Sequence, residues 1–147
     1  AQHSSIMSCN KINAAVITPV LAAGSATSPY FVQVNISQRL CYPTCVDKVP
    51  VFNPAFSVQG VAMVGAGQYV VTIKVEGVIS YDPYGGGSCC MKSQLISQTF
   101  TVPVASATAP TSVTVVAGTS VNSVSATGCQ QCTRAFVSET PLTVTVA

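Results

Sequence analysis

Alternation of apolar and polar residues with a period of two runs through almost the whole chain, and no helical periodicity interrupts it. One face of residues 68–81 is apolar and carries Tyr69, Val71, Ile73, Val75 and Ile79. Residues 30–40 repeat the pattern with Tyr30, Val32, Val34, Ile36 and Leu40. A strand with one apolar face has to bury that face, so the pattern predicts an all-β chain with these residues in its core.

Further strands are predicted at residues 12–21, 56–64, 94–104, 112–116, 121–126, 133–137 and 142–146. Turn signals separate them at Gly24-Ser25, Asn53-Pro54, Gly65 to Gly67, Pro83 to Gly87, Gly118 and Gly128. Gly77, inside the clearest strand, predicts a bulge or a bend. Eight or nine strands at this spacing are typical of a single two-sheet antiparallel β-sandwich or jelly roll. We expect an N-terminal arm at residues 1–11 and one sandwich domain at residues 12–147.

Charge is scarce, since only 7% of the residues are charged and 48% are hydrophobic. The basic residues are scattered along the chain as Lys11, Arg39, Lys48, Lys74, Lys92 and Arg134. Without a basic cluster, nucleic acid is not an expected partner. The longest apolar stretch, residues 14–23, is interrupted by Thr18 and Pro19 and is shorter than the roughly 20 residues of a membrane span, which is therefore not expected.

Groups for catalysis are few. Acid–base or nucleophilic chemistry needs a titrating side chain held beside a partner. The chain offers one histidine, His3 in the arm, and four carboxylates, Asp47, Glu76, Asp82 and Glu139. The glycine runs GAG and GGG are not followed by Gly-Lys-Ser/Thr and predict hairpin turns rather than a phosphate loop. We expect no enzyme, no catalytic residue and no cofactor.

Cysteine is the informative residue type. Six cysteines come in three pairs near turns, Cys41 with Cys45, Cys89 with Cys90, and Cys129 with Cys132. Neighbouring residues of an extended chain point to opposite sides, so Cys89 and Cys90 can hardly bond to one another and can reach two different partners. One could bridge to the Cys41/Cys45 segment and the other to the Cys129/Cys132 segment, or one could leave the subunit. All six are disulfide candidates, and spacing alone does not fix their pairing.

Zinc is the competing chemistry, because Cys-x-x-x-Cys and Cys-x-x-Cys can supply four thiolates. The ample apolar strands and the left-over thiols favour disulfides, so no metal site is expected. The odd cysteine, Cys9, is either a small buried residue or internal partner, or a crosslink from the arm to a neighbouring copy. In the same way, residues 12–21 either form the first strand of their own subunit or complete the sheet of a neighbour. Disulfides suit an extracellular site or the surface of a cell or spore.

The cysteine-bearing arm ending at Cys9, the Val/Thr/Ser-rich strands of residues 12–146 and the cysteines in rim loops resemble, in their organisation, the subunits of bacterial endospore appendages. In that family the connector carries a cysteine doublet, whereas the doublet of this chain is Cys89-Cys90. The resemblance implies a stable extracellular fibre of single β-sandwich subunits with no catalytic or ligand site. Its carry-over to residues stops at Cys9 as an intersubunit link.

These features favour a structural, self-assembling subunit of an extracellular fibre, pilus-like appendage or surface layer, whose partners are copies of itself. A second hypothesis is a virion structural protein, such as a decoration, tail or fibre component. A third is a β-sandwich that binds carbohydrate or a host protein, for which Tyr42, Tyr81 and Tyr84 could offer a stacking surface.

Overall fold

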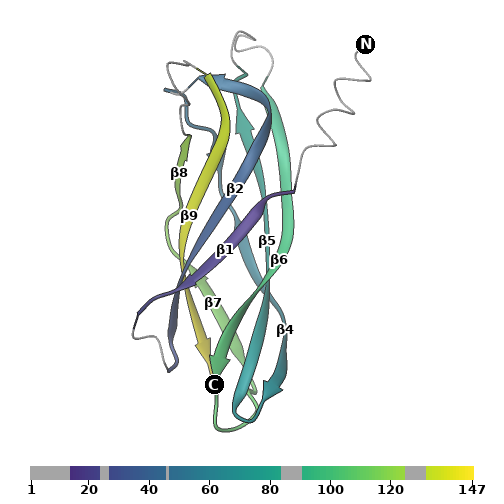
Figure 1. The fold of residues 1–147 in the computed structure, drawn as a ribbon, viewed down its shortest axis with the longest axis vertical. Coiled ribbons are helices and arrows are strands. Elements are labelled where there is room, and N and C mark those ends of the chain that lie inside the picture. Colours follow the sequence, from purple (N-terminus) through teal and green to yellow (C-terminus); the bar gives the residue numbers. More distant parts are fainter. Residues whose placement is uncertain (1–13, 24–26, 46, 84–90, 125–131) are drawn as a thin grey trace.

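The computed structural model describes residues 14–23, 27–45, 47–83, 91–124 and 132–147, with only the backbone for Cys132. These residues form nine strands and no helix (Figure 1), so the prediction of an all-β chain is confirmed. The strands are β1 (Val16–Leu21), β2 (Tyr30–Cys45), β3 (Val51–Phe52), β4 (Ala55–Gly65), β5 (Gln68–Tyr81), β6 (Lys92–Ala105), β7 (Val113–Ala117), β8 (Val121–Val124) and β9 (Cys132–Val146).

Two antiparallel sheets make up an elongated sandwich (Figure 1). The first sheet has the order β1-β2-β9-β7, and β8 also pairs with β9. The second has β5 between β6 on one side and β4 and β3 on the other. Each sheet therefore has one long strand that pairs along one side with two strands in succession: β9 with β7 and β8, and β5 with β4 and β3.

The core lies between the sheets and contains the side chains that the alternation predicts. The residues predicted for the apolar faces of β2 and β5 are all buried. Phe52 of β3 meets Phe136 of β9 edge to face, with 5.9 Å between ring centroids, and so joins the two sheets. Burial of these alternating faces is the main favourable contribution to folding.

A single strand, β9, replaces the two strands predicted at residues 133–137 and 142–146, and it continues through Pro141. Pro141 lies between the segments paired with β8 and with β7, and its carbonyl accepts a hydrogen bond from the Gly118 amide at 2.8 Å. A residue of an antiparallel strand presents its N–H and C=O to the same neighbour. The missing N–H of Pro141 therefore faces the gap between the short strands, where no ladder bond is lost.

Of the bulge or bend expected at Gly77, the bulge is not formed. The pairing of β5 with β6 is regular through Gly77 and Ile96. Gly77 instead faces the break between β3 and β4, where a Cβ atom would lie 2.5 Å from Cε1 of Phe52. The residue is small because an aromatic ring occupies that space. The short strand β3, which carries Phe52, was not predicted.

The N-terminal region is described only from residue 14 onward. The predicted strand 12–21 begins at Val16 and pairs with β2 of its own subunit. The predicted arm, residues 1–11, lies outside the described residues. The part of the chain that the structure describes contains no helix with the length and hydropathy of a membrane span.

Candidate functional site

One end of the sandwich, here called the cysteine end, collects the strand termini that border the predicted disulfide candidates. β2 ends there with Cys41 and Cys45, and β9 begins there with Cys132. Tyr81, the last residue of β5, and Lys92, the first of β6, are register partners at this end (Figure 1). The segment with Cys89 and Cys90 connects those two residues. Cys9, Cys89, Cys90 and Cys129 themselves lie outside the described residues.

A large bulge carries Cys41 at this end. Arg39 of β2 pairs with Ala135, but the next pair is Thr44 with Thr133, so residues 40–43 of β2 stand opposite a single residue of β9. A bulge bends its strand away from regular pairing. The backbone amides of the bulge must then find partners outside the ladder, because buried N–H groups are rarely left unpaired.

Two side chains of the opposite sheet supply those partners. Gln94 of β6 accepts a hydrogen bond from the Cys41 amide through Oε1 at 2.8 Å and donates through Nε2 to the Arg39 carbonyl at 3.3 Å. Tyr81 of β5 accepts from the Tyr42 amide at 3.1 Å and donates to Gln94 Oε1 at 3.0 Å. The bulge is therefore tied across the sandwich, and Cys41 is held in one position.

Burial raises the pKa of the Tyr81 phenol, and the hydrogen bond from the Tyr42 amide offsets part of this rise. Tyr81 is 2% exposed and packs in the core. It cannot present a ring to a sugar, so its expected place in a stacking surface is wrong. Tyr42 is half-buried, with the Lys92 ammonium 4.8 Å from its ring centroid, and Tyr84 lies outside the described residues.

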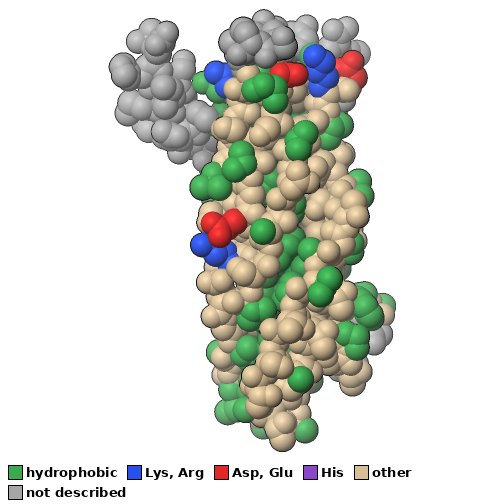
Figure 2. Space-filling model, turned by 180° about the vertical axis from the view of Figure 1, so that it is seen from behind, with side chains coloured by type: hydrophobic (Ala, Val, Ile, Leu, Met, Phe, Trp, Pro, Cys, Tyr) green, Lys and Arg blue, Asp and Glu red, His purple; other side chains and the backbone are tan. Residues whose placement is uncertain are grey.

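Charged side chains gather at the cysteine end as well (Figure 2). Arg39, Asp47, Lys48, Asp82, Lys92 and Arg134 lie in or next to the strand ends that meet there. Lys48 Nζ lies 4.0 Å from Asp82 Oδ2, and Thr44 Oγ1 donates to the Asp82 carbonyl at 2.9 Å. An exposed ion pair of this length contributes little to stability. The Thr44 bond, from a fully buried side chain, joins the end of β2 to the end of β5.

The two cysteines with described side chains differ in state. Cys41 is disulfide-bonded, and Cys45 carries a free, partly exposed thiol. The described residues contain no other cysteine side chain, so the pairing among the six candidates and the role of Cys9 stay predictions. Within the same residues, no three His, Cys, Asp or Glu side chains group in a way that could hold a metal ion.

The carboxylates considered for catalysis are spread along the sandwich. Glu76 pairs with Lys74 at 3.4 Å in the middle of β5, and Glu139 accepts from Gln33 Nε2 at 3.2 Å on β9. Asp82 pairs with Lys48 at the cysteine end. These contacts are ones that ordinary surface side chains make. His3 lies outside the described residues.

The opposite end of the sandwich, here called the uncharged end, is chemically different. It contains the start of β2 and β5, the end of β6 and β9, and the β4–β5 turn (Figure 1). No Asp, Glu, Lys or Arg occurs in residues 12–38, 49–73, 93–133 or 140–147, which supply all of this end. Several large apolar side chains are exposed on it, among them Leu21, Met63, Val64 and Val116.

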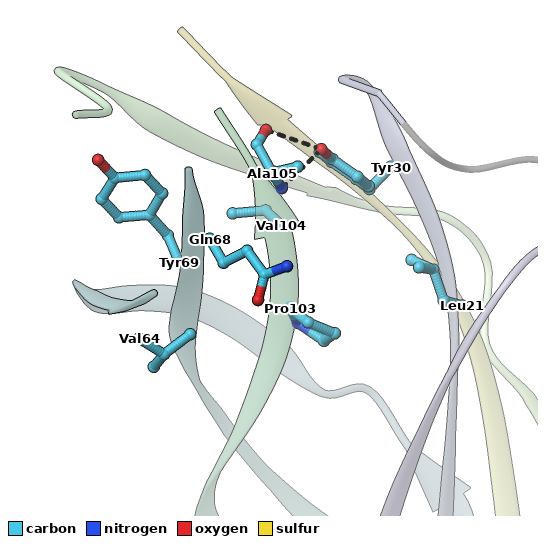
Figure 3. Close-up of a pocket in the computed structure, with 8 residues that line it drawn as sticks. All are labelled: Leu21, Tyr30, Val64, Gln68, Tyr69, Pro103, Val104 and Ala105. Atoms are coloured by element: carbon cyan, nitrogen blue, oxygen red, sulfur yellow. Dashed lines mark hydrogen bonds between the residues drawn. The ribbon is translucent and has the colours of Figure 1, made fainter. Parts of the chain in front are cut away.

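A groove of about 300 Å³ opens at the uncharged end (Figure 3). Its lining residues are Leu21, Tyr30, Val64, Gln68, Tyr69, Pro103, Val104 and Ala105. The Tyr30 hydroxyl donates to the Ala105 carbonyl at 3.0 Å and accepts from the Ala105 amide at 2.9 Å, which fixes the groove floor to both sheets. The only side-chain amide is that of Gln68, so the groove suits an apolar side chain better than a charged ligand.

A comparison with protein families, with characterised proteins and with solved structures finds no match to this chain. The resemblance to endospore-appendage subunits therefore stays a prediction.

Proposed function

We propose that the protein is a structural, self-assembling subunit of an extracellular fibre, pilus-like appendage or surface layer, with copies of itself as partners. The observation that carries the proposal is the set of apolar side chains left uncovered at the uncharged end and along the sheet edges. Met63 and Val64 of β4 are 67% and 62% exposed, and Val116 of β7 is 66% exposed. Exposed apolar side chains that gather at one end of a molecule are typical of a protein–protein contact.

The edges of both sheets support the same proposal. β1 pairs only with β2, and β4 pairs only with β5, so each has one side without a strand partner among the described residues. Monomeric proteins protect such edges with lysines, prolines or bulges. β1 has one proline, Pro19, and β4 has two register shifts, but neither strand has a charged residue. Edges with so little charge favour pairing with another chain.

The difference between the two ends supports a polymer rather than a closed dimer. One end carries charge and cysteine, and the other carries apolar side chains and a groove. A contact between unlike surfaces repeats without closing, unless a rotation happens to close a ring, and produces a filament. On this proposal, disulfides at the cysteine end and a Cys9 crosslink would make the filament resistant to dissociation.

Electron microscopy with a matched pair of variants tests the proposal. Met63→Lys places a charge at the uncharged end on a side chain that is already exposed, and Ser97→Lys places the same charge on an exposed position in the middle of β6. We expect filaments from the wild type and from Ser97→Lys, and short or no filaments from Met63→Lys, with equal circular dichroism spectra. Isolated particles of monomeric mass from the wild type would refute self-assembly.

The crosslink is tested separately on non-reducing gels. We expect a ladder of oligomers that collapses with reductant and that is lost in Cys9→Ser. A ladder that is unchanged in Cys9→Ser would remove the intersubunit role of Cys9 and leave the filament proposal standing.

A further inference from the structure

Cys45 and Cys132 are register partners across the β2–β9 pair, the last pair before the cysteine end opens. The two residues are far apart in sequence, and the sequence pattern gave each of them several other candidate partners. Their juxtaposition follows from the bulge at residues 40–43, because it shifts the register of β2 against β9 between Arg39 and Thr44. Without that shift, the register of Arg39 with Ala135 would carry Cys45 beyond Cys132, the first residue of β9.

Register alone places this pair within reach of a disulfide bond. Residues directly opposite in an antiparallel pair have Cα atoms about 4.5 or about 5.5 Å apart, depending on the hydrogen-bonding position. A disulfide accepts Cα separations of roughly 4.4 to 6.8 Å, so both alternatives fit. Directly opposite residues also share one face of the sheet.

The backbone around Cys45 is held in place before any bond forms. The Cys45 carbonyl accepts a hydrogen bond from the Lys48 amide at 3.0 Å. Its neighbour Thr44 is fully buried, pairs with Thr133, and is bonded to Asp82 of the other sheet. On the β9 side, the Thr133 hydroxyl accepts from the Ala135 amide at 3.1 Å. Both strands therefore reach this pair in a fixed arrangement, and the partly exposed Cys45 thiol is open to a small oxidant.

The geometry points to a cross-strand disulfide between Cys45 and Cys132, formed by thiol–disulfide exchange with a small disulfide such as oxidised glutathione. The Cys45 thiolate attacks one glutathione sulfur, which forms a mixed disulfide and releases one glutathione thiolate. The Cys132 thiolate then attacks the Cys45 sulfur and releases the second glutathione thiolate. The two protein thiols are oxidised, the glutathione disulfide is reduced, and the two protons pass to the released thiolates. The bond would pin β2 to β9 on the outer side of the bulge.

Free-thiol mapping on single-cysteine variants tests this pairing. The full chain is treated with oxidised glutathione, its free thiols are alkylated at acidic pH, and alkylated cysteines are located by tandem mass spectrometry. In the wild type we expect Cys45 and Cys132 both to be protected. In Cys132→Ser we expect Cys45 to become alkylated, and in Cys45→Ser we expect Cys132 to become alkylated. In each case the alkylated fraction of that cysteine should rise from almost none to almost complete.

Three results would overturn the pairing: Cys45 alkylated in the treated wild type, Cys45 still protected in Cys132→Ser, or Cys132 still protected in Cys45→Ser. Cys41→Ser serves as the matched control, because it removes a cysteine of the same strand and should leave Cys45 protected. If a variant fails to fold, the disulfide-linked peptides of the unreduced wild type are fragmented in the mass spectrometer. The fragments show which cysteine carries the bond, because backbone cleavage separates Cys41 from Cys45 and Cys129 from Cys132. This bond lies within one subunit, so the loss of filaments or of the gel ladder would not bear on it.

Discussion

Replacing Gln94 with alanine should destabilise the sandwich more than any other change of a partly exposed glutamine. The side chain accepts from the Cys41 amide at 2.8 Å and from the Tyr81 hydroxyl at 3.0 Å, and it donates to the Arg39 carbonyl at 3.3 Å. The first two bonds have favourable lengths, whereas the third is long. Loss of the bond from the Tyr81 hydroxyl costs about 1 kcal/mol, and leaving the buried Cys41 amide without its acceptor costs about 1–3 kcal/mol. We therefore expect Gln94→Ala to lower the free energy of unfolding by about 2–4 kcal/mol.

Chemical and thermal unfolding measure this loss. For a chain of this length, about 3 kcal/mol corresponds to a fall in Tm of about 10 °C. Gln98→Ala is the matched control, because Gln98 lies four residues further along β6 on the same face and is also half-buried, but its side chain makes no hydrogen bond to another described residue. It should change the free energy of unfolding by about 0.5 kcal/mol or less. Equal losses in the two variants would show that the cross-sandwich network does not hold the bulge.

Two further perturbations test other parts of the sandwich. Gly77→Ala should lower the free energy of unfolding by about 1–3 kcal/mol, because its Cβ would lie 2.5 Å from the Phe52 ring. In the double variant with Phe52→Leu, the smaller side chain should reduce that loss. Additive losses in this double-mutant cycle would contradict the close packing. The raised pKa of Tyr81 means that the folded state favours the neutral phenol over the phenolate. The stability that this preference contributes is complete below the usual tyrosine pKa of about 10, and it is lost as the pH rises through the raised pKa. Denaturant midpoints measured between about pH 9 and about pH 11 should fall more steeply for the wild type than for Tyr81→Phe, and equal slopes would contradict this assignment.

The fold was largely predictable because alternation over long strands is a strong signal. The apolar faces of β2 and β5 are complete in the sequence and are buried as expected. Strand boundaries were less predictable, because they depend on the neighbouring strands of the sheet. Pro141 is compatible with a continuous β9 only because β7 and β8 leave a gap beside it. Gly77 is small because of Phe52, a contact that joins two residues distant in sequence.

The cysteine end was predictable only in outline. The cysteines near turns indicated a rim, but the bulge that sets the register of Cys45 was not evident from the sequence. The predicted strand ended at Leu40, whereas β2 continues to Cys45. Gln94 offered one unused signal: it is a polar residue on the same face of β6 as Ile96 and Phe100. A polar side chain in such a position needs a hydrogen-bond partner, and here the partner is the bulge.

The separation of charge between the two ends determines how the molecule responds to dissolved ions. Mobile ions screen the interactions of exposed charges, almost completely beyond about 10 Å at ordinary ionic strength, but they have no such effect on the packing of neutral apolar groups. Binding at the Lys, Arg and Asp cluster would therefore vary between fresh water and brine. Contacts made through the end around Met63 and Val64 would keep their strength in both.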